Sequence, residues 1–199
     1  MVRVVFARVA LTGMLVMTAC AGGSEPLSIG EPGPSFTQTE VFTRSCGTQI
    51  RGGDVRARSA SRDRIGPLTL FGLSSMAEVS NEEFEPNEFG GLVPMKFITQ
   101  IDGDEPVWLA VAAEHRDRAA LIYDASKMRP SPGDTEWRFR LDAGSVAVRF
   151  DTCHGESGFT QYNGGIVVSG AGCVTLEVYV GSMSNPPLIR AAPFGSGSC

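Results

Sequence analysis

The sequence predicts an all-β protein, an antiparallel β-sandwich of about eight or nine strands preceded by a signal peptide and a flexible tether. Three observations support this prediction. Short apolar runs separated by Gly, Pro, Asn and Asp fill the chain from residue 36 onward. Several of these runs alternate apolar and polar residues. The first 35 residues differ in composition, because a basic and apolar leader is followed there by a stretch rich in Gly, Ser, Pro and Glu.

The apolar runs are predicted as strands. Residues 174–180 (VTLEVYV) and 146–150 (VAVRF) alternate most clearly, which is typical of antiparallel strands with one buried face. Residues 119–123 are predicted as a buried strand. The predicted strands, in chain order, are 68–79, 92–101, 107–112, 119–123, 136–141, 146–150, 166–169, 174–180 and 188–191.

Residues with turn preferences separate these runs. Residues 102–104 (DGD) divide two strands, residues 130–134 (PSPGD) divide another pair, and residues 142–144 (DAG) are short enough for a hairpin. Residues 80–91 contain four glutamates and a proline, which predicts a surface loop. We therefore expect a single β-sandwich domain over residues 36–199.

The N-terminus has the composition of a signal peptide. Arg3 and Arg8 supply positive charge, residues 9–18 form an apolar run, and small residues follow at 19–23. The apolar run is too short to span a bilayer. We therefore predict a signal peptide over residues 1–19 and export from the cytoplasm.

Residues 17–20 (MTAC), at the end of this leader, resemble the lipobox of bacterial lipoproteins. The resemblance implies that Cys20 is acylated and anchors the chain on the extracytoplasmic face of the cell membrane, although Met17 stands where the family usually has Leu. The alternative is a secreted protein, because residues 19–21 (ACA) also fit an ordinary cleavage site. Residues 20–35 are expected to form a flexible tether, which favours the anchor.

Four cysteines remain once Cys20 is set aside, an even number that suits disulfide bonds in an oxidising compartment. Three pairings of four cysteines are possible. Cys153 and Cys173 flank a glycine-rich stretch and are expected to end adjacent strands, which predicts a disulfide between them. Cys46 and Cys199 then pair by default and join the start of the folded body to the last residue.

The charge balance argues against a nucleic-acid partner. The whole chain has a net charge of −5. Removing Arg3 and Arg8 from the 17 basic residues leaves 15 against 22 acidic ones, a net charge of −7. Binding to phosphates needs a basic surface, so the acidic mature chain is poorly suited to it.

No catalytic residue, cofactor site or metal site is predicted. Asp151, Cys153, His154 and Glu156 lie within one short segment, but a disulfide at Cys153 would remove a ligand, and a polar loop is the simpler interpretation. His154 precedes Ser157 by three residues, without the G-x-S-x-G context of a serine hydrolase.

Residues 159–165 (FTQYNGG) are the most suggestive stretch for recognition, because aromatic and polar side chains together make binding surfaces. The candidate binding surface consists of Gln161, Tyr162 and Asn163. The alternative is a strand end in which Asn163 and Gly164 form a turn.

Residues 160–165 (TQYNGG), residues 172–174 (GCV) and the C-terminal Cys199 are similar to exported proteins of high-G+C Gram-positive bacteria. The resemblance implies no activity. We expect a non-enzymatic envelope lipoprotein that binds an envelope protein, a glycan or a small ligand. Two alternatives stay open, namely an envelope hydrolase whose site is assembled from distant residues and a structural accessory subunit of an envelope complex.

Overall fold

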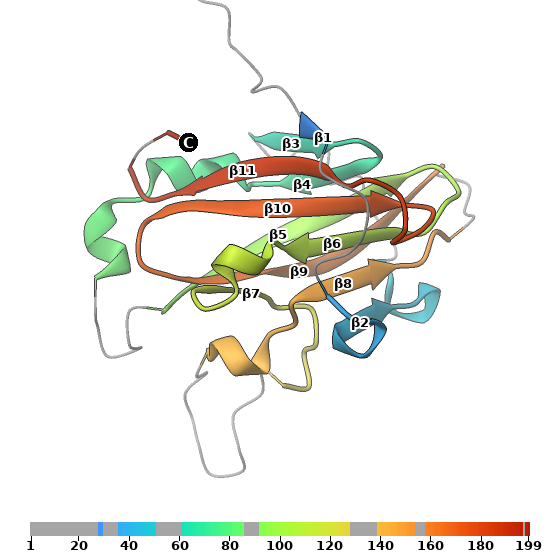
Figure 1. Cartoon of the computed structure of the whole chain (residues 1–199), viewed down its shortest axis with the longest axis horizontal. Helices are drawn as coiled ribbons and strands as arrows, with labels where there is room; N and C mark the ends of the chain where they lie inside the picture. The colour runs from blue at the N-terminus through green and yellow to red at the C-terminus, as the bar shows by residue number, and fades with distance from the viewer. Residues whose placement is uncertain are drawn as a thin grey trace, which may run out of the picture.

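The computed structural model describes residues 28–29, 36–50, 61–85, 92–127, 139–153, 158–196 and 198–199 of the 199-residue chain. Over these ranges the protein is all-β, with its strands arranged in two mostly antiparallel sheets (Figure 1). We call the six-stranded sheet A and the five-stranded sheet B. No helix within these ranges is long and apolar enough to cross a membrane.

Sheet A has strands from both ends of the chain. Its β2–β8 pair is parallel, with Val41 opposite Ala147, whereas the other paired strands in the described ranges are antiparallel. The two N-terminal strands form its outer edges. In spatial order the strands are β1 (Ser28–Ile29), β11 (Leu188–Phe194), β10 (Gly172–Val180), β6 (Val107–Val111), β8 (Ala147–Phe150) and β2 (Val41–Arg44).

Sheet B is built around one long antiparallel pair. β5 and β9 pair over their whole lengths, from Leu92 opposite Ser169 to Asp102 opposite Phe159. In spatial order the strands are β3 (Arg62–Ile65), β4 (Leu68–Phe71), β5 (Leu92–Asp102), β9 (Phe159–Ser169) and β7 (Ala119–Leu121).

Short 3-10 helices occupy several connections between the strands. At the first of them, the backbone N–H and the side-chain hydroxyl of Thr37 both donate to Glu40 Oε2, each at 2.7 Å. The described 3-10 helices are η1 (Gln38–Glu40), η2 (Cys46–Thr48), η4 (Ser74–Glu78), η5 (Asn81–Phe84), η6 (Ala113–His115) and η7 (Leu141–Ala143).

The two sheets contribute to one hydrophobic core. Alternate residues of β10 point into it because successive side chains of a strand point to opposite faces. Sheet B supplies the facing side chains, mainly from β4, β5 and β9. The largest fully buried side chains include Tyr162 and Ile166 from sheet B and Phe150 and Leu109 from sheet A.

Contacts join the sheets at two corners. At one corner, Leu121 of β7 bonds to Ser145 in both directions at 2.8 and 2.9 Å, just before the chain enters β8. At the other corner, Arg190 of β11 forms an ion pair with the buried Asp63 of β3 at 3.8 Å. Asp63 also accepts a hydrogen bond from the Ser74 N–H at 2.8 Å, so its burial is compensated.

The N-terminal segment covers part of sheet A on the face away from the shared core. Phe36 lies edge-on to Tyr179 of β10, with ring centroids 5.6 Å apart, and both rings are buried. Trp108 of β6 lies in the same cluster and is 7% exposed. Because β1 pairs with β11, two residues of the predicted tether are part of the sheet.

Most predicted strands are confirmed, with altered ends. The predictions for 92–101, 107–112, 119–123, 146–150, 174–180 and 188–191 match β5, β6, β7, β8, β10 and β11. The strand predicted at 68–79 is too long, because β4 ends at Phe71 and η4 follows. The strand predicted at 166–169 is too short, because β9 begins at Phe159. Residues 142–144 form no hairpin, since η7 lies there. Of the strand predicted at 136–141, residues 136–138 are outside the described residues and residues 139–141 contain no strand.

The predicted disulfide pairing is wrong. Cys46 is bonded to Cys153, and Cys173 is bonded to Cys199. The prediction assumed that the strands next to Cys153 and Cys173 are adjacent, but β6 lies between β8 and β10 in sheet A. The parallel β2–β8 pair places the residues after Arg44 beside those after Phe150, which brings the first pair of cysteines together.

Candidate functional site

The predicted binding surface lies in the middle of β9, and two of its three side chains are not at the surface. Tyr162 is fully buried and Gln161 is 4% exposed, whereas Asn163 is exposed. The prediction of a contiguous binding surface is therefore wrong for Gln161 and Tyr162. The alternative of a turn at Asn163 and Gly164 is also wrong, because both residues pair with β5.

Tyr162 lies between the sheets next to the Cys46–Cys153 disulfide. Its hydroxyl donates to the carbonyl oxygen of Asp151 at 2.7 Å and lies 3.3 Å from Cys153 Sγ. Its ring packs against Phe150 with centroids 5.4 Å apart. Burial is the main cause that raises the pKa of Tyr162 to about 12, and nearby Asp151 acts in the same direction.

Tyr123, which follows β7, is a second buried phenol in the same region. Its hydroxyl hydrogen-bonds to Thr99 Oγ1, and its ring lies edge-on to Phe150 at a centroid distance of 5.1 Å. Burial raises the pKa of Tyr123 above its usual range. The ring also lies against the backbone of Gly164, where an added Cβ would come within 2.1 Å of it.

Arg44, at the end of β2, connects this aromatic cluster to both sheets. Its Nη1 donates to the carbonyl oxygens of Tyr123 at 2.9 Å and Asn163 at 3.2 Å, and its Nη2 donates to the carbonyl oxygen of Thr48 at 2.8 Å. The guanidinium also lies over the Tyr162 ring, 5.4 Å from the centroid. Arg44 thereby donates from a sheet-A strand to one carbonyl group of β9 in sheet B and to the carbonyl group of Tyr123 after β7.

Arg44, Tyr123 and Tyr162 form contacts that hold the two sheets together, and neither phenol is suited to proton transfer at neutral pH. At neutral pH both phenols remain protonated, because burial raises the pKa of Tyr162 and Tyr123. A general base at neutral pH needs a pKa near the operating pH, and neither phenol meets that condition. Burial lowers the pKa of Arg44, whose guanidinium acts here as a donor to fixed carbonyl groups.

Gln161 belongs to a separate polar chain on the opposite face of sheet B. Its Nε2 donates to Gln100 Oε1 at 2.9 Å, and Gln100 Nε2 donates to Asp102 Oδ1 at 2.7 Å. Both glutamines are buried, so these bonds compensate the burial of their amides. These hydrogen bonds explain why a polar residue is buried at position 161 without any role in binding a ligand.

Four residues of segment 151–156 were considered as metal ligands, and the structure describes two of them, Asp151 and Cys153. Cys153 is in a disulfide and cannot ligate a metal, and Asp151 forms an ion pair with Arg149 at 3.0 Å. His154 and Glu156 lie outside the described residues. Across the described ranges, no group of three or more His, Cys, Asp and Glu side chains is close enough to hold a metal ion.

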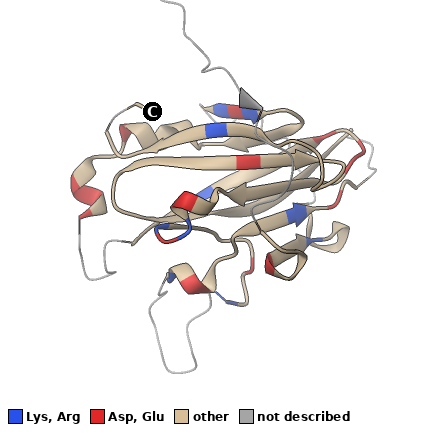
Figure 2. Cartoon of the chain, viewed as in Figure 1, with Lys and Arg blue, Asp and Glu red and all other residues tan. Residues whose placement is uncertain are grey.

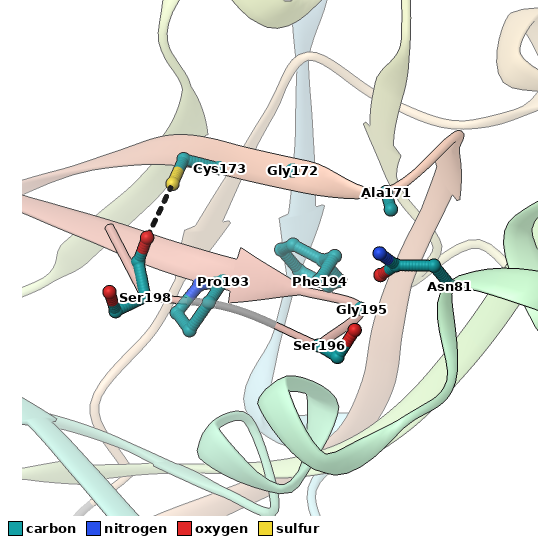
Figure 3. Close-up of a pocket in the computed structure, with 9 residues that line it drawn as sticks. All are labelled: Asn81, Ala171, Gly172, Cys173, Pro193, Phe194, Gly195, Ser196 and Ser198. Atoms are coloured by element: carbon teal, nitrogen blue, oxygen red, sulfur yellow. Dashed lines mark hydrogen bonds between the residues drawn. The ribbon is translucent and has the colours of Figure 1, made fainter.

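A pocket of about 310 Å³ lies at the end of the β10–β11 hairpin, beside the second disulfide (Figure 3). This volume is at the lower end for small-molecule sites. Cys173 Sγ lies 4.0 Å from the carbonyl oxygen of Ser198, the contact drawn in Figure 3. Its lining residues include Asn81, Pro193, Phe194, Ser196 and Ser198.

The pocket has its shape because of Gly195. This residue has a φ of +85°, and an added Cβ would lie 2.4 Å from Asn81 Oδ1 and 2.7 Å from Ala171 Cβ. Its N–H donates to the carbonyl oxygen of Met76 in η4 at 3.0 Å. Gly195 therefore lets the amide of Asn81 approach the end of β11, where Figure 3 shows it pointing toward Phe194.

Sequence reasoning did not identify Arg44 or the pocket. The partners of Arg44 are 79 and 119 residues away in sequence, so no local pattern signals its role. The pocket combines Asn81 of η5 with residues of β10, β11 and the segment after them, which no local sequence pattern brings together. Comparison of the chain with protein-family models, with curated proteins and with solved structures finds no match.

Proposed function

We propose that this chain is an exported envelope protein, anchored in the cell membrane through an acylated Cys20 and carrying a non-enzymatic binding domain. The observation that supports it best is the pairing of all four cysteines of the folded body in two disulfides. Disulfides persist in oxidising, extracytoplasmic compartments. The basic and apolar leader that ends at Cys20 gives an independent reason to expect export.

The proposal includes a β-sandwich as the architecture of the domain. Two sheets that share one core and meet at two corners favour this arrangement over a single open sheet. In Figure 1, sheet A lies in front of most of sheet B. The sandwich would present loops and hairpin ends at its perimeter, which is where the pocket beside Cys173 lies.

Changing Cys20 to Ala tests the anchor. We expect the wild-type chain in the membrane fraction, with acyl chains on Cys20 detected by mass spectrometry of the N-terminal peptide. We expect Cys20→Ala to appear in the medium or in the soluble envelope fraction, because the domain would lose its acyl chains. A Cys20→Ala chain that stays in the membrane fraction would contradict the anchor.

The pocket beside Cys173 is the proposed binding site, and its chemistry suits a small polar ligand such as a sugar. The amide of Asn81 and the hydroxyls of Ser196 and Ser198 supply donors and acceptors. Pro193, which is half-buried, supplies an apolar surface for the ring face of a sugar, whereas the Phe194 side chain is 1% exposed and belongs to the shared core. A few polar groups around an apolar surface are the usual composition of a ligand site.

Titration with monosaccharides and N-acetylated amino sugars tests this site. We expect at least one of these probes to shift the NMR signals of the Asn81 side-chain amide and of Gly195. We expect Asn81→Ala to weaken that binding by about tenfold, the loss of one or two net hydrogen bonds. The control is Asn185→Ala, since Asn185 is exposed in the loop at the other end of the same hairpin. Equal weakening by both variants, or no shift with any probe, would reject the site.

A further inference from the structure

We infer that the edge of the domain formed by β1, β11 and β3 faces the membrane and contacts anionic lipid headgroups through Arg62 and Arg64. This inference rests on the proposed anchor at Cys20. It goes beyond the anchor by stating how the domain is oriented on the membrane and which residues contact lipid headgroups. Three observations support it: the length of chain between Cys20 and β1, the place of β1 in the sheets, and the charges on β3.

The chain between the anchor and the folded domain is short. Ser28, the first residue of β1, is eight residues after Cys20. Eight residues reach at most about 28 Å, whatever their conformation. The position of β1 in the fold therefore decides which part of the domain is nearest the bilayer.

β1 lies at one extreme edge of the protein. It pairs with β11, where Ser28 is opposite Ile189, and the Arg190–Asp63 ion pair connects β11 to β3. In the view of Figure 1, β1 and β3 lie toward the upper edge and β7 lies toward the lower edge. β7 forms the opposite edge of sheet B. A domain of this size is about 40 Å across, so the tether is too short to let the β7 edge rest on the membrane while β1 points away.

The β3 edge presents positive charge to that side. Arg62 and Arg64 are exposed, whereas Asp63 between them is buried against Arg190. Because Arg62 and Arg64 alternate with the buried Asp63 and Ile65, both arginine side chains lie on the face of β3 opposite the core-facing one. Figure 2 colours the arginine positions of β3 blue. Contacts hold their side chains along the edge, since Arg62 lies over Phe71 and Arg64 Nε donates to the Gly66 carbonyl oxygen at 2.9 Å.

The expected strength of this contact follows from the electrostatics of anionic bilayers. An arginine near such a surface favours association by a factor of about five at moderate salt, and the effect disappears beyond about 10 Å. Two arginines give too little affinity to hold the protein alone. On a chain that is already anchored, they are sufficient to select one orientation.

The test uses the chain from Cys20 onward with both disulfides formed, so that Cys20 is the available thiol. This thiol is coupled to a maleimide-headgroup lipid in nanodiscs that contain a gadolinium-chelating lipid. The chemical link replaces the acyl anchor, so the orientation can fail independently of acylation in cells. Methyl NMR then reports paramagnetic relaxation at Ile65 in β3, Ile189 in β11 and Ile122, which follows β7.

We expect relaxation at Ile65 and Ile189 to exceed that at Ile122, and the difference to grow at least twofold when phosphatidylglycerol replaces half of the phosphatidylcholine. We expect Arg62→Gln/Arg64→Gln, or 0.5 M salt, to remove this growth, because the charge interaction is lost or screened. The matched control is Lys127→Gln, an exposed cation after β7. It should leave the pattern unchanged.

Two outcomes would overturn the inference. One is relaxation at Ile122 as strong as at Ile189 in anionic discs. The other is a double arginine variant in which the relaxation difference still grows in anionic discs. Arg62 and Arg64 would then serve only to prevent the edge strand β3 from pairing with other chains. Neither outcome would affect acylation of Cys20, which the fractionation and mass spectrometry decide separately.

Discussion

Replacing Cys46 and Cys153 together by Ala should reduce the free energy of unfolding more than replacing Cys173 and Cys199 together. The first disulfide closes a loop of 107 residues and the second a loop of 26 residues. From the lost restriction of the unfolded chain, we expect decreases of about 5 kcal/mol and about 3.5 kcal/mol, respectively. Denaturant unfolding of the oxidised proteins measures both values.

Peptide mapping without reduction provides the control for these variants. The wild-type protein should yield a peptide pair joined through Cys46 and Cys153 and a second pair joined through Cys173 and Cys199. Each double variant should retain the other pair. A peptide that links Cys153 to Cys173 would contradict the fold around the parallel β2–β8 pair. A larger loss from the short loop would contradict the assignment of loop lengths.

Replacing Gly164 by Ala should be among the most destabilising single changes in the domain, lowering the free energy of unfolding by about 3 kcal/mol. The new methyl group would lie 2.1 Å from the nearest ring carbon of Tyr123. That ring cannot move aside easily, because it is 2% exposed, packs against Phe150 and hydrogen-bonds to Thr99. Chemical denaturation measures the loss.

A double-mutant cycle separates this clash from other effects of alanine in a strand. In a Tyr123→Leu background, Gly164→Ala should cost about 1 kcal/mol or less, because the ring is absent. Gly47→Ala is the control in open space, since the nearest atom to an added Cβ there is Ser45 Oγ at 3.9 Å. It should change stability by about 0.5 kcal/mol at most. Equal costs of Gly164→Ala in both backgrounds would contradict the packing of Tyr123.

The long strands could be predicted because their burial pattern is local. In β10, Val174, Leu176 and Val178 alternate with residues of the other face, and a period of two is visible in the sequence. The same reasoning missed β3, whose sequence RDRI contains three charged residues. Asp63 is buried there because Arg190, far away in sequence, forms an ion pair with it. A local pattern contains no information about that partner.

The candidate site could not be predicted for a related reason. Asn163 and Gly164 have the local preference of a turn, and that preference favoured the wrong structure. Gly164 is a strand residue whose missing side chain makes room for Tyr123. The pairing of the cysteines likewise depends on which strands are neighbours in space, and β2 (Val41–Arg44) and β8 (Ala147–Phe150) are far apart in the 199-residue sequence. The order of the strands in the sequence therefore does not predict that β2 and β8 lie side by side.

The place of the N-terminal strands has a consequence for biogenesis. β1 pairs with β11, the last strand, and β2 pairs with β8, so the edges of sheet A join residues that are synthesised at very different times. Pairing between such distant residues forms slowly and cannot begin before the later partner is present. A nascent chain thus stays incompletely folded until its C-terminal strand has been made. Under the proposed export, translocation machinery that accepts only unfolded polypeptides would have that interval in which to move the chain across the membrane.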